Sequence, residues 1–203
     1  MRLLPACLLL VPAAAVHAAA SHAAPAAAGP VSAAPATWHA YDLLIDLQHL
    51  PKTYTCDDLW YKFHDLLLEL GARAYMTITP YHCGAPGRGE ERFPSVELKF
   101  QLPQPLIGNA TRYAGISAVT RTLRVAPGSP RSIGAGDCEL VRQLEGTLFA
   151  ALPVRLTAAS FNCTPARPAT PGREPFALTL EAAIAQPPVP APAPGATAAV
   201  PRS

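Results

Sequence analysis

The second half of the chain repeats the pattern of the first half. Cys56 opens an apolar helical pattern and Cys83 follows the strand pattern after it, while Cys138 and Cys163 hold the same two places in the second half. Cys56 and Cys138 lie 82 residues apart, and Cys83 and Cys163 lie 80 residues apart. A Gly/Pro-rich loop and another alternating strand follow in each half. We therefore predict an α+β fold of two tandem βαββ repeats, each with a mixed or antiparallel sheet, one helix on a face and an internal disulfide.

The first repeat shows each of these elements in its apolar periodicity. Residues 41–47 alternate as a half-buried strand, and further strands are expected at 75–79 and 96–102. Thr55 is a favourable helix N-cap, and Gly71 is a favourable residue for ending the helix. The apolar residues between them fall on one helical stripe: Leu59, Phe63, Leu66, Leu67 and Leu70.

The second repeat follows the same order with a weaker opening strand. That strand is expected within residues 113–125, and a Gly/Pro-rich loop covers 126–136. Asp137 takes the place of Thr55, so we predict that it caps the second helix. The sequence leaves open whether the two repeats pair into one sheet or pack as two lobes.

The ends of the chain indicate export. Residues 1–23 combine a positive start, a short apolar run and small residues, which is typical of a secretory signal peptide. An Ala/Pro-rich linker is predicted at 24–37, the repeats at 38–103 and 109–186, and a Pro/Ala-rich tail at 187–203. We expect a periplasmic or secreted protein that keeps no stable membrane span once the signal is cleaved.

Four cysteines remain in the exported part of the chain, and they can pair in three ways. Each helix is expected to run antiparallel to the strand after it, which brings the helix start beside the strand end. This geometry favours Cys56–Cys83 and Cys138–Cys163. Each bridge would stabilise the fold by roughly 3–4 kcal/mol.

Several classes of chemistry lack the residues that they require. The formal net charge is +2, so nothing points to nucleic-acid binding. His49, His64 and His82 are weak metal candidates, because no HxH, HxxxH or HExxH spacing accompanies them. Neither a CxxC motif nor a phosphate-binding loop is present. The sequence therefore favours a protein without cofactor, metal or catalytic activity.

Aromatic residues mark a possible interaction face in the first repeat. Trp60 and Tyr61 lie near the start of the predicted helix, and Tyr81 lies at the end of the strand after it. Exposed Trp and Tyr side chains are frequent anchors of protein interfaces. Packing in the core or over the disulfide is the alternative role for these rings. The export signal, the disulfide-linked repeats, the Pro/Ala-rich spacers and the lack of a catalytic motif lead to the main hypothesis, a non-catalytic periplasmic protein that binds another envelope protein.

Two other hypotheses remain open. In one, a small-ligand site or active site lies between the repeats, with His49, His64, His82, Asp42 and Asp46 converging beside arginines of the second repeat. In the other, a strand edge adds to a partner's sheet, which requires an uncovered and unbroken edge strand. Convergence of those side chains in a pocket would favour the first of these, and their dispersal would favour a binding module.

Overall fold

The computed structural model describes residues 33–84, 93–107, 115–163 and 174–187. It confirms the α+β class, with six strands and two helices. The elements in chain order are β1 (Ala34–Asp46), α1 (Cys56–Glu69), β2 (Thr77–Tyr81), β3 (Ser95–Pro105), β4 (Ile116–Val125), η2 (Ala135–Asp137), α2 (Cys138–Leu144), the π-helical turn η3 (Glu145–Phe149), β5 (Arg155–Phe161) and β6 (Phe176–Ala185). Within the described part of the chain, no helix has the length and hydropathy that a membrane span requires.

All six strands belong to one sheet in the order β2-β3-β1-β4-β6-β5, and every neighbouring pair is antiparallel. The long β1–β3 ladder runs without interruption from the Ala36–Pro105 pair to the Asp46–Ser95 pair. Among the described residues, the strand pairing that joins the two halves of the sheet is that of Ala34–Ala36 with Ile116–Ala118. The strands therefore form a single sheet, which was one of the two arrangements that the sequence left open.

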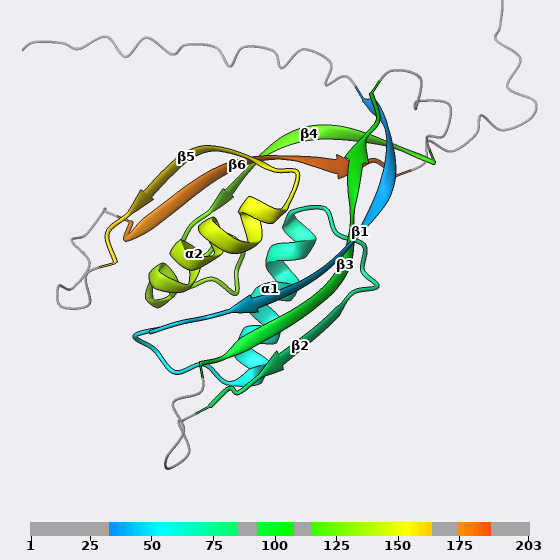
Figure 1. The fold of residues 1–203 in the computed structure, drawn as a ribbon. Helices are drawn as coiled ribbons and strands as arrows, with labels where there is room; N and C mark the ends of the chain where they lie inside the picture. Colours follow the sequence, from blue (N-terminus) through cyan, green and yellow to red (C-terminus); the bar gives the residue numbers. More distant parts are fainter. Residues whose placement is uncertain (1–32, 85–92, 108–114, 164–173, 188–203) are drawn as a thin grey trace, which may run out of the picture. The chain divides into compact units, whose positions relative to one another are not determined.

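The two helices lie on the same side of the sheet, in the angle between β1–β3 and β4–β6 (Figure 1). The predicted stripe of α1 is buried along its whole length, from Leu59 to Leu70. It packs in one core with the inward residues of β3 and β6, which include Leu98 and Leu178. Apolar residues of α2 and η3, such as Val141 and Phe149, belong to the same core. Both halves of the chain thus share one hydrophobic interior.

The first strand begins earlier than the sequence predicted. β1 starts at Ala34, inside the stretch 24–37 that reads as a linker. Pro35 is tolerated there because its carbonyl accepts a hydrogen bond from the Leu106 amide at 2.9 Å, which needs no N–H from the proline. Ala36 is fully buried. The Ala/Pro-rich composition of this stretch does not indicate a strand, because the strand depends on pairing with β3 and β4, which are distant in sequence.

The structure contains the two disulfides predicted from the sequence, Cys56–Cys83 and Cys138–Cys163. Each joins the start of a helix to the end of the strand that follows it. Their surroundings differ, because Cys56 is exposed whereas Cys138 is only 6% exposed. Solvent therefore reaches the first bridge more readily than the second.

Gly71 ends α1 as predicted and also sets the distance between α1 and β6. Its φ is +86°, and the bonds from the Gly71 amide to the Leu68 carbonyl and from the Ala72 amide to the Leu67 carbonyl form a Schellman motif. A Cβ added at this position would lie 2.9 Å from Ile184 Cδ1 on β6. Glycine is thus required here by both the backbone and the neighbouring strand.

We expect Gly71→Ala to lower the free energy of unfolding by about 2 kcal/mol, because the left-handed conformation and the contact with Ile184 both disfavour a methyl group. Urea unfolding monitored by tryptophan fluorescence measures the change. Gly146→Ala is the matched control, since a Cβ at Gly146 meets no atom within 4 Å. Equal losses in the two variants would contradict the argument.

Candidate functional site

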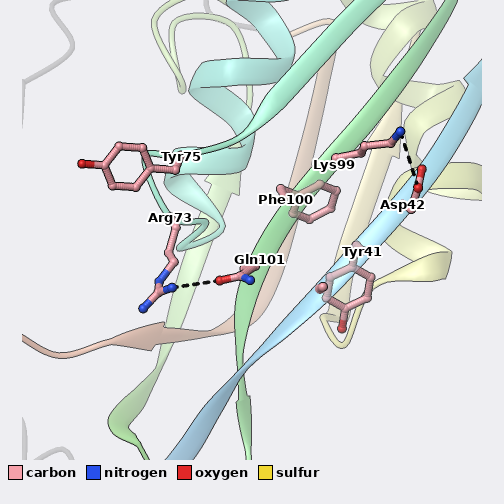
Figure 2. Close-up of a pocket in the computed structure, with 8 residues that line it drawn as sticks. Tyr41, Asp42, Arg73, Tyr75, Lys99, Phe100 and Gln101 are labelled. Atoms are coloured by element: carbon pink, nitrogen blue, oxygen red, sulfur yellow. Dashed lines mark hydrogen bonds and ion pairs between the residues drawn. The ribbon is translucent and has the colours of Figure 1, made fainter.

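A shallow depression of about 510 Å³ lies over β1, β3 and the segment between α1 and β2 (Figure 2). We call it the β1–β3 groove; its lining includes Ala40, Asp42, Arg73, Tyr75, Lys99 and Gln101, beside Tyr41 and Phe100. The strand register places Asp42 opposite Lys99 and Ala40 opposite Gln101. These residues alternate with the core residues of the same strands, so they occupy the sheet face that the helices leave open.

Arg73 is held in a defined orientation at one side of the groove. Its backbone N–H donates to the Gln101 carbonyl at 3.1 Å, and its Nη1 donates to Gln101 Oε1 at 3.0 Å. The guanidinium also lies 4.5 Å from the ring centroid of Trp38. Tyr75, two residues further on, is 94% exposed. The ring of Tyr75 and the cation of Arg73 thus border the groove, and stacking on Trp38 and hydrogen bonding to Gln101 fix the cation.

Lys99 lies at the other side of the groove, where it points towards Asp42 (Figure 2). Its Nζ is 2.7 Å from Glu97 Oε1 and 3.8 Å from Asp42 Oδ2. The hydrogen bond with Glu97 raises the pKa of Lys99, and the same contact lowers the pKa of Glu97. Lys99 and Glu97 therefore remain charged and paired with each other near neutral pH, so Lys99 is not a free base.

The structure places the three predicted interface aromatics on two separate surfaces. On α1, the Trp60 ring stacks on His64 at 4.6 Å and meets Tyr61 edge-on at 5.1 Å. Tyr81 instead donates its hydroxyl to Glu97 Oε2 at 2.8 Å, which places it on the open face of the sheet. None of the ring contacts among the described residues joins Tyr81 to Trp60 or Tyr61.

The histidines considered as metal ligands have separate surroundings. His49 packs edge-on against Phe93 at 4.8 Å, whereas His64 stacks on Trp60. His82 adjoins Cys83 with a positive φ of 54°. In the part of the chain that the structure describes, no three His, Cys, Asp or Glu side chains are grouped as metal ligands.

A buried ionic cluster joins the two halves of the chain. Lys62 Nζ on α1 lies 2.6 Å from Asp137 Oδ2, and their side chains are 10% and 1% exposed. Asp137 also accepts from the Tyr54 hydroxyl at 2.9 Å and from the Gly134 amide at 2.6 Å, while Lys62 donates to the Ser132 carbonyl. Asp137 occupies the N-cap position of α2, as predicted, but its side chain makes no capping hydrogen bond to that helix. Its carboxylate turns towards Lys62 instead.

The charges of this cluster are mutually stabilised. Burial alone would raise the pKa of Asp137, but the hydrogen bonds from Lys62, Gly134 and Tyr54 and the charge of Lys62 outweigh burial and lower it. Burial, followed by the charge and hydrogen bond of Asp137, raises the pKa of Tyr54. Each of these groups bonds to another member of the cluster, so the role of the cluster is to hold the two halves of the chain together.

We expect the free energy of unfolding to fall with acidification, from roughly pH 5 towards pH 2. The folded-state pKa of Asp137 lies below its ordinary value of 3.8, so its contribution is complete above that value and is lost as the pH falls through the folded-state pKa. Urea unfolding across this range measures the slope. Asp137→Asn should reduce this slope, whereas Asp46→Asn, which changes an exposed carboxylate, should leave most of the slope in place. An unchanged slope in Asp137→Asn would contradict the assignment.

Sequence reasoning missed the residues that border the groove and the buried ion pair. The sequence does indicate that Lys62 is unusual, because this lysine lies on the apolar stripe of α1, three residues after Leu59 and four before Leu66. No local sequence pattern links Trp38 with Arg73, because 35 residues separate them and the β1–β3 register brings them together.

Comparisons of the chain with models of protein families, with curated protein sequences and with solved structures found no match.

Proposed function

We propose that this chain is an exported, non-catalytic protein-binding module of the bacterial periplasm, and that the β1–β3 groove binds another envelope protein. The observation that carries this proposal is the pair of exposed side chains Arg73 and Tyr75 at one side of the groove, with Arg73 stacked on the half-buried Trp38. Trp, Tyr and Arg are the residue types that contribute most to protein-binding energy.

Preorganisation of Arg73 supports this role. Its stacking on Trp38 and its bond to Gln101 restrict the side chain before a partner arrives. An ordered arginine loses less conformational entropy on binding than a free one. Gln101 is neutral, so the charge of Arg73 remains available to a carboxylate of the partner.

The two halves of the chain support a duplicated βαββ unit. The strand order β2-β3-β1 of the first half is matched in reverse by β4-β6-β5, and each half has one disulfide between its helix start and the following strand. Arg155 occupies the place of Arg73, 82 residues later, and its Nε lies 2.9 Å from Glu181 Oε2. Glu181 occupies the place of Gln101, 80 residues later.

This equivalence supports binding at the first unit rather than at the second. The second unit neutralises its arginine with Glu181, and the strand registers place Thr120 where the first unit has Trp38. The groove chemistry is therefore specific to the first unit. Dispersal of His49, His64 and Asp42 supports binding over an active site between the units.

The signal-like N-terminus and the disulfides support this compartment. Two disulfides in a domain of this size are typical of oxidising compartments such as the periplasm. The export segment 1–23 lies outside the described residues and remains a prediction, and the same holds for the predicted tail 187–203 beyond its first residue.

The proposal is tested by quantitative capture from a periplasmic extract, followed by titration of the purified partner. We expect Arg73→Ala/Tyr75→Ala to weaken binding about 30-fold, the effect of losing a typical hot spot. Gln101→Glu, which recreates the Arg155–Glu181 pair in the first unit, should also weaken it. Arg155→Ala is the matched control and should bind normally.

Two results would count against the groove. Unchanged affinity in Arg73→Ala/Tyr75→Ala would exclude it as the binding surface. Loss of affinity in Trp60→Ala/Tyr61→Ala alone would instead assign binding to the surface of α1, as the sequence suggested.

A further inference from the structure

Within the part of the chain that the structure describes, the strand β5 forms an open edge of the sheet. It pairs with β6 on one side and is the last strand in the sheet order. Its residues 155–160 are all exposed. An edge of this kind presents unpaired backbone N–H and C=O groups to any strand that approaches.

The opposite edge is protected in ways that β5 is not. β2 has only five residues, and Pro80 within it has no N–H to donate. β5 has seven residues and no proline, and its only charged residue, Arg155, lies at its start in a salt bridge with Glu181. One irregularity in the β5–β6 register lies between Leu156 and Ala158, and the pairing continues from Ala158 to Phe161.

Hydrogen bonding beside β5 shows which of its backbone groups face outward. The Asn162 amide donates to the Pro175 carbonyl at 2.7 Å, so Asn162 directs its backbone N–H towards the neighbouring chain segment. Antiparallel strands alternate these directions, so Ser160 and Ala158 also face β6. Ala159 and Phe161 therefore direct their N–H and C=O groups away from the sheet.

We infer that this edge binds the β5 edge of a second copy of the chain, in an antiparallel pair centred on Ala159. In that register Ala159 faces itself, Ala158 faces Ser160, and Thr157 faces Phe161. The strand is thus complementary to itself, because only small, hydroxyl or aromatic side chains meet and no like charges face one another. Two-fold symmetry is also the commonest arrangement of homodimers.

Strand pairing alone covers less surface than the roughly 1,200 Å² of a stable complex, so the dimer is expected to be weak. Sedimentation velocity of the mature protein, from roughly 5 to 500 μM, tests this with a concentration-dependent shift from monomer to dimer. Ala159→Lys places like charges opposite each other across the two-fold axis and should remain monomeric. Thr77→Lys, on the other edge strand, is the matched control and should dimerise as the native protein does.

Mixing Ala159→Lys with Ala159→Glu restores opposite charges at the two-fold axis, so the mixture should form a heterodimer that native mass spectrometry identifies by mass. If the native protein stays monomeric over the whole concentration range of the sedimentation experiment, the inference is overturned. A strand of another protein would then be the candidate partner of the β5 edge. The inference is also overturned if Ala159→Lys dimerises by itself, or if the mixture of Ala159→Lys and Ala159→Glu forms no heterodimer. Circular dichroism of each variant establishes that it is folded.

Discussion

Lys62→Met is expected to lower the free energy of unfolding by about 3–5 kcal/mol, the usual cost of removing one partner from a buried ion pair. The loss follows because Asp137, only 1% exposed, would keep its charge without a cation 2.6 Å away. The Ser132 carbonyl would also lose its hydrogen bond from Lys62. Urea unfolding at pH 7 with the disulfides intact measures the loss through the fluorescence of the two tryptophans.

The double variant Lys62→Met/Asp137→Asn separates the ion pair from simple loss of packing. Asparagine retains an oxygen for the Gly134 amide but no charge, so the double variant should be more stable than Lys62→Met alone. Lys52→Met is the control, since Lys52 is 48% exposed and 3.5 Å from Asp137, and it should cost less than about 1 kcal/mol. Similar losses for Lys52→Met and Lys62→Met would show that burial does not determine the effect.

Local patterns predicted the elements and the disulfides well. The stripe from Leu59 to Leu70 follows helical periodicity, and Val96 to Leu102 follows strand alternation, so both core faces could be identified from nearby residues. The pairing of Cys56 with Cys83 followed from the antiparallel course of a helix and the strand after it. These predictions succeeded because each depends on residues that are close in sequence.

Contacts between distant segments could not be predicted in the same way. Asp137 resembles an N-cap in sequence, but its partner Lys62 lies 75 residues away, and a buried ion pair competes with local capping. The sequence also did not reveal that β1 begins at Ala34, because the pairing with β4 determines that boundary. The groove has the same origin, since the register of β1 with β3 brings Trp38 near Arg73.

Removing either disulfide by paired Cys→Ala substitution is expected to lower the free energy of unfolding by roughly 3–4 kcal/mol, through the greater freedom of the unfolded chain. The two losses should be similar, because the bridges span 27 and 25 residues. Urea unfolding of Cys56→Ala/Cys83→Ala and of Cys138→Ala/Cys163→Ala compares them directly.

Reduction of the folded native protein should nevertheless distinguish the two bridges, because a thiolate must reach a sulfur before exchange can occur. Cys56 is exposed and Cys138 is 6% exposed, so dithiothreitol should reduce Cys56–Cys83 first. Differential alkylation and mass spectrometry follow each bridge separately. Simultaneous reduction of both bridges would indicate that global unfolding, rather than local access, controls the exchange. Prior reduction of Cys138–Cys163 would contradict the argument from burial, because the more shielded sulfur would then be the more reactive one.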